Sequence, residues 1–262
     1  IRYHMDLFKS SNPALSDSIF SKAGAFSTEE TMTVRGTMNK TFLMLFLVVL
    51  GAAFTWKTFF DSIPADAKQI AVPTSVIVWG AIGLVGGLIS SLVIIFAPKT
   101  SPYAAPIYAV LEGLFLGGIS ALFASAYNGI VMQAVGLTFI TFFLMLVAYR
   151  SGWIKVTQKF RTIIIIATAA IGLMYFISMM ISLFGGNTSF ITGSSLLSIG
   201  ISIFVVVIAA LNILLDLDFI DRASAQGAPK YMEWFGAFGL MVTLVWLYIE
   251  FLKLLAKLNS RD

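Results

Sequence analysis

Seven apolar stretches, each long enough to cross a lipid bilayer, constrain this chain more than any other feature. An α-helix rises about 1.5 Å per residue, so about 20 apolar residues cross the ~30 Å of hydrocarbon. The stretches are bounded by charged residues, proline or glycine, and they show no strict apolar and polar alternation, which favours helices over barrel strands. They cover residues 41–60, 74–96, 106–127, 129–149, 162–184, 196–220 and 233–258. We therefore predict an all-α membrane protein with seven transmembrane helices.

Composition supports this class and excludes several others. Hydrophobic residues make up 58% of the chain and charged residues 11%, which does not fit a soluble globule. Cysteine is absent and His4 is the single histidine, so a disulfide scaffold, a histidine or cysteine metal site and a histidine triad are excluded. No G-x-S-x-G nucleophile motif occurs. We expect no enzyme activity and no cofactor.

The positions of the basic residues predict orientation. The net charge of +4 would suggest a nucleic-acid partner in a soluble protein, but here the basic residues flank apolar stretches. The segments on the side of the amino terminus carry 12 Lys and Arg, and the opposite segments carry 5. Because positive loops resist translocation, we predict a cytoplasmic tail at 1–38, a membrane domain at 39–258 and a short tail at 259–262. Seven crossings would place the carboxyl terminus outside the cell, whereas a re-entrant last segment would place it in the cytoplasm. Membrane lipid is the expected partner, and nucleic acid is not.

Glycines at four-residue spacing indicate close helix packing. Gly83 and Gly87 lie in the second stretch, and Gly113 and Gly117 lie in the third. Small residues at this spacing let helix backbones approach each other in lipid. We expect these two helices to pack against one another.

Among the carboxylates of the apolar stretches, Glu112, Asp216 and Glu250 are in the most costly positions. An ionised side chain at a helix centre costs about 2.5 to 3.5 kcal/mol on insertion scales, so such groups usually face the bundle interior and have a function. Structural roles remain open for two of them. Glu112 can serve as a hydrogen-bonding group, and Glu250 can pair with Lys253, three residues further along the helix.

The acids at the end of the sixth stretch fall on different helix faces. Asn212 and Asp216 stack on one face, whereas Asp218 is turned about 200° from Asp216. Asp218 has Arg222 four residues on, which is typical of an ion pair at the cytoplasmic boundary. A calcium loop of EF-hand type starting at Asp216 fails, because its glycine and glutamate positions are not matched. Asp216 is the better candidate for an inward carboxylate.

At these residues the chain resembles the bacterial branch of the Bax inhibitor-1 family. The resemblance rests on Leu-Asn-Ile-Leu-Leu-Asp-Leu-Asp-Phe at 211–219, Leu-Tyr-Ile-Glu-Phe-Leu-Lys-Leu-Leu at 247–255 and Tyr-Ala-Val-Leu-Glu-Gly at 108–113. It implies a seven-helix bundle with the last helix central, in a bacterial inner membrane, and a pH-sensitive calcium leak. Asp216 and Glu250 would form the proton-responsive pair and bind calcium transiently, and Lys99 would be nearest to the basic gate partner.

Helix geometry leaves the contact between the two acids open. Asp216 lies 11 residues before the turn near Gly227 and Glu250 lies 23 after it. On straight antiparallel helices this offset is roughly 18 Å, so the acids touch only if a helix is distorted, or else they line different depths of one path.

Two other functions also stay open. One is a non-conducting regulator that binds a membrane protein through helix faces and the basic tail. The other is a proton-coupled transporter that uses Glu112 and Asp216.

Overall fold

Seven long helices form the protein in a computed structural model, which describes residues 30–63 and 71–260. Each is long and apolar enough to cross a membrane, so the prediction of an all-α protein with seven spans is confirmed. The described ranges contain no β-strand, only an isolated bridge between Thr31 and Pro229. The long helices are α2 (Val34–Asp61), α3 (Thr74–Phe96), α4 (Ser101–Ala126), α5 (Ile130–Arg150), α6 (Gln158–Leu183), α8 (Leu196–Ala225) and α9 (Met232–Asn259). Two short elements, η1 (Pro98–Thr100) and α7 (Ser189–Thr192), lie in the connections.

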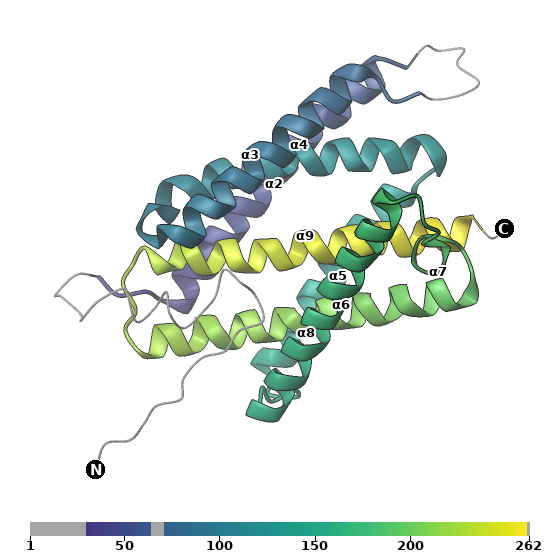
Figure 1. The fold of residues 1–262 in the computed structure, drawn as a ribbon. Coiled ribbons are helices and arrows are strands. Elements are labelled where there is room, and N and C mark those ends of the chain that lie inside the picture. Colours follow the sequence, from purple (N-terminus) through teal and green to yellow (C-terminus); the bar gives the residue numbers. More distant parts are fainter. Residues whose placement is uncertain (1–29, 64–70, 261–262) are drawn as a thin grey trace.

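The last helix occupies the centre of the bundle. Figure 1 shows α9 in yellow between the group formed by α2, α3 and α4 and the antiparallel α8. It packs against α2, α4, α5 and α8, and most of its apolar side chains are buried, with Phe235, Leu240 and Leu247 fully so. The predicted central position of the last helix is therefore confirmed. Its 28 continuous residues extend about 42 Å, which is long enough for a full crossing of the membrane.

Side-chain caps fix where several helices begin. The hydroxyl of Thr33 accepts a hydrogen bond from the backbone N–H of Gly36, which starts α2 at Val34, before the apolar stretch predicted from residue 41. Thr157 caps α6 and Ser195 caps α8 in the same way. Each cap satisfies one of the N–H groups that a helix leaves without an internal partner.

Glycine allows α4 to lie between α2 and α3. At Gly83 of α3 a Cβ atom would clash with the backbone of α4, as the sequence led us to expect. Gly113 and Gly117 differ from the expectation, because a Cβ at either would clash with the backbone of α2. The side of α4 that faces α3 carries Gly118 instead, opposite Gly80. The four-residue spacing was correctly linked to close packing, but it could not say which neighbour each pair would meet.

Candidate functional site

A line of polar side chains crosses the apolar bundle between α6, α8 and α9, and we call it the polar line. On α6 and α9 its members recur every seven residues, which is two helical turns or about 10.5 Å, so they stay close to one face. On α8 the partners include Asn212, Asp216 and Asp218. The α6 members are Arg161, Thr168 and Tyr175, and the α9 members are Thr243, Glu250 and Lys257.

Asp216 lies inside the protein, toward the Arg161 end of this line. Its side chain is 1% exposed, and the hydroxyl of Thr243 donates a hydrogen bond of 2.5 Å to its Oδ2. One turn away, Asn212 donates through Nδ2 to the hydroxyl of Thr168 at 2.8 Å and to the backbone oxygen of Ile208 at 2.9 Å. Asp216 and Asn212 therefore join α8 to α9 and to α6 respectively, in a region otherwise lined by apolar residues.

Glu250 lies further along α9 and is also 1% exposed. Tyr175 donates to its Oε2 at 2.9 Å, and the indole of Trp246 donates to its Oε1 at 3.1 Å. The ammonium of Lys253 lies 2.5 Å from Oε1 and also donates to the hydroxyl of Tyr175 at 3.0 Å. Glu250 therefore meets both expectations from the sequence: it faces the interior of the bundle, and it forms an ion pair with Lys253.

The structure places Asp216 and Glu250 at different depths of the polar line. Asp216 bonds to Thr243, which precedes Glu250 by seven residues on the same helix. That spacing corresponds to about 10.5 Å along the axis. The direct carboxylate pair that the family resemblance implies is therefore not formed in this structure, because α8 and α9 are both regular helices at these positions.

Asp218 lies at the end of the polar line near Arg161. It forms the predicted ion pair with Arg222, at 2.6 Å, and a second one with Arg161 of α6, at 2.9 Å. Sequence reasoning treated Asp218 as a solvated boundary acid and did not single out Arg161, which is buried. The seven-residue spacing of Arg161, Thr168 and Tyr175 on an apolar helix was a signal that could have found it.

Glu112 and Lys99 lie outside the polar line. Glu112 is buried on α4 and approaches Gly87 of α3 so closely that a Cβ there would lie 3.1 Å from its Oε2. Lys99 is exposed on η1 and forms no ion pair within residues 30–63 and 71–260. The structure thus does not bring either of them to Asp216 or Glu250.

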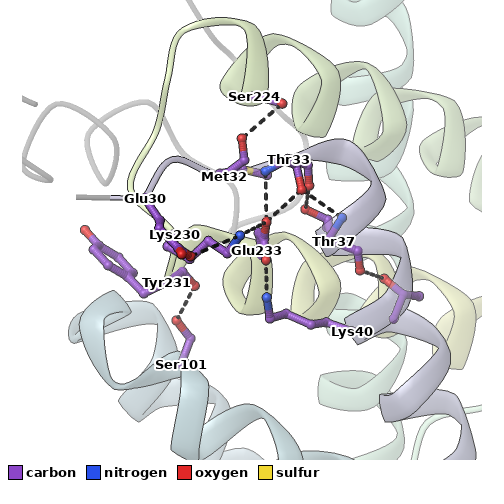
Figure 2. A network of polar contacts seen from close by, with 12 residues as sticks. Glu30, Met32, Thr33, Thr37, Lys40, Ser101, Ser224, Lys230, Tyr231 and Glu233 are labelled. Carbon is purple, nitrogen blue, oxygen red and sulfur yellow. Dashed lines mark hydrogen bonds and ion pairs between the residues drawn. The ribbon is translucent and has the colours of Figure 1, made fainter. Parts of the chain in front are cut away.

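A second polar cluster surrounds Glu233 in the first turn of α9 (Figure 2). This side chain is fully buried, and its Oε1 accepts hydrogen bonds of 2.9 Å from both the backbone N–H and the hydroxyl of Thr33. Lys40 of α2 pairs with Oε2, and Lys230 lies 3.4 Å from Oε1. At Gly36 a Cβ would collide with the carboxyl group, so the lack of a side chain there leaves room for Glu233.

Backbone contacts extend the Glu233 cluster into a join between α2 and the α8–α9 connection. The N–H of Met32 donates to the oxygen of Ala228 at 2.7 Å. The hydroxyl of Ser224 donates to the oxygen of Met32 at 3.2 Å (Figure 2). Sequence analysis missed Glu233 because an acid in the first turn of a helix is common, being favoured by the helix dipole. Only the packing of α2 across it shows that the carboxylate is buried.

Comparison with known proteins agrees with this architecture. None of the curated proteins compared with the chain matches it. The family model described as Bax inhibitor 1 like matches residues 12–260, which include all seven spans and both polar clusters. The match covers nearly the whole sequence, and the fold has the seven helices and the central last helix that the resemblance implied. The chain is therefore an integral membrane protein that belongs to the Bax inhibitor 1 like family.

Proposed function

We propose that this protein is a calcium leak channel in which protonation of Asp216 and Glu250 controls the flux. The observation that carries the proposal is that both acids are buried at successive levels of one polar line through the membrane domain. Carboxylates kept away from water in a membrane bundle usually mark an ion or proton pathway. The proposal includes a bacterial inner membrane as the location and a cytoplasmic amino terminus.

Oxygen chemistry supports a hard cation as the transported ion. The polar line offers carboxylates, hydroxyl groups and an amide, and calcium prefers oxygen ligands of this kind. In the described part of the chain no three Asp, Glu, His or Cys residues gather into a metal-binding group. Calcium is therefore proposed as a passing ion that meets Asp216 and Glu250 in turn.

The pH dependence follows from charge. An ionised carboxylate attracts a cation, and a protonated one does not, so acid is expected to lower the flux. The proposed pH dependence does not rely on repulsion between two touching carboxylates. Asp216 bonds to Thr243, which lies about two turns before Glu250 on α9. Each acid acts at its own level, and Lys253 offsets the charge of Glu250 at 2.5 Å.

The test is calcium efflux from vesicles that contain the purified protein, measured between pH 6 and pH 8. A unit charge about 4 Å away is worth about 4 kcal/mol to a cation at an effective dielectric constant of 20, and about 1.4 kcal/mol is tenfold. We expect Asp216→Asn to lower the flux at pH 8 at least about tenfold and to flatten its pH dependence. The control is Asp61→Asn, at an exposed acid near the end of α2. An Asp216→Asn protein that folds and conducts like the control contradicts the proposal.

The relay of Glu112 and Asp216 proposed for a transporter gains no support from the geometry. Glu112 packs between α4 and α3, whereas Asp216 bonds to α9. Solute uptake that follows the proton gradient, and that the Glu112→Gln variant loses, would favour the proton-coupled transporter instead.

A further inference from the structure

Lys257 ends the polar line, and its ammonium group is enclosed by oxygen atoms. Its Nζ donates to the backbone oxygen of Ile191 at 2.5 Å, to the hydroxyl of Ser202 at 2.7 Å and to the backbone oxygen of Ser198 at 3.3 Å. An ammonium has three N–H donors, so these three acceptors satisfy it completely. The lysine lies seven residues beyond Glu250 on the same helix.

The three oxygen atoms are held in place without the lysine. Ile191, Ser198 and Ser202 are buried, and the hydroxyl of Ser198 donates to the oxygen of Ile191 at 2.7 Å. That hydrogen bond fixes α7 against α8. Two carbonyl oxygens and one hydroxyl, all uncharged, form the kind of ligand set that binds a hard cation.

The position of this oxygen site matters because the polar line leads to it. A cation that has passed Glu250 meets Lys253 and then Lys257, which lie one turn apart on α9. Two like charges cannot occupy one small, poorly hydrated site, so the ammonium excludes an ion from these oxygens as long as it stays there.

We propose that Ile191, Ser198 and Ser202 form a cation-binding site, and that Lys257 is a tethered cation which fills it and closes this end of the path. The inference rests on the proposed leak function. It adds a second control point, at the α7 end of the bundle, which opens when the ammonium leaves the oxygens.

The variant Lys257→Met tests this closure in the vesicle assay. Methionine keeps an apolar side chain of similar length and removes the charge. We expect a several-fold rise in calcium flux, and we expect methylammonium to block the rise because a free ammonium ion can refill the empty oxygen site. The wild type should be insensitive to methylammonium. In the Lys257→Met background, Ser202→Ala should weaken the block because it removes one of the three oxygens.

The matched control is Lys57→Met, since Lys57 is an exposed lysine near the end of α2 that pairs with Asp61. Equal flux in Lys257→Met and wild type, in protein that still responds to Asp216→Asn, would refute the plug and leave the leak function intact. A rise in flux that methylammonium does not block would show that Lys257 only ties α7 to α9.

Thermal unfolding gives a readout that does not depend on conduction. Methylammonium should raise the unfolding temperature of Lys257→Met but not that of the wild type, because a ligand of the folded state stabilises it. If no variant conducts, the leak function fails, and this shift alone decides whether the cation site exists. If methylammonium does not raise the unfolding temperature of Lys257→Met, the proposed cation site is refuted.

Discussion

The Glu233 cluster offers the sharpest test of how the fold is held together, through the substitution Glu233→Gln. Glutamine keeps the size of the side chain but removes its negative charge. The carboxylate now accepts two hydrogen bonds of 2.9 Å from Thr33 and pairs with Lys40, while being 0% exposed. The change therefore leaves Lys40 opposite a neutral amide, and it turns charge-assisted hydrogen bonds into ordinary ones.

The size of the effect follows from these contacts. Removing one partner of a buried ion pair costs about 3 to 5 kcal/mol. Lys40 remains 20% exposed, so water can partly solvate its ammonium once the carboxylate charge is gone. Hydrogen bonds to charged groups contribute about 1.5 to 3 kcal/mol each, and glutamine can keep part of the two from Thr33. We expect Glu233→Gln to lower the free energy of unfolding by about 3 kcal/mol.

The assay is unfolding of the purified protein by SDS in mixed micelles, followed by tryptophan fluorescence. Asp61→Asn is the control, because it breaks an exposed ion pair with Lys57, which is worth about 0 to 1 kcal/mol. The double variant Lys40→Met, Glu233→Gln should recover part of the loss, since it no longer leaves the ammonium of Lys40 opposite a neutral amide. If Glu233→Gln and Asp61→Asn shift the unfolding equally, the reasoning about the buried cluster is wrong.

Two further predictions concern other parts of the chain. Gly113→Ala should destabilise the protein by about 1 to 3 kcal/mol, because its Cβ would press on the backbone of Val48 in α2. Gly136→Ala should be neutral or stabilising, because its Cβ would meet no neighbouring helix within 4 Å. SDS unfolding of the two variants compares them directly. Deleting residues 5–29 should leave calcium flux unchanged, because it spares Thr33 and every member of the polar line. A cellular activity that this deletion abolishes, but that survives neutralising Asp216 and Glu250, would instead favour the non-conducting regulator.

The sequence by itself determined the class of fold and the number of spans. Both depend on local properties, namely the length and the apolarity of each stretch, and α3 has the same bounds in the structure as the stretch predicted at 74–96. Sequence also singled out Asp216 and Glu250, because the cost of a carboxylate in lipid does not depend on which neighbour it meets. The ion pair of Asp218 with Arg222 followed in the same way from spacing within one helix.

Tertiary structure alone decided which helix each polar group meets. In the assembled bundle Glu233 is buried under α2, and Gly113 faces α2 rather than α3. Tyr175 hydrogen-bonds to Glu250, and Thr243 hydrogen-bonds to Asp216. In a membrane, lipid chains are as apolar as leucine, so hydrophobicity does not mark the face on which one span contacts the next. The rotation and the partner of each helix come from close packing and interhelical hydrogen bonds, which exist only once all seven helices are assembled.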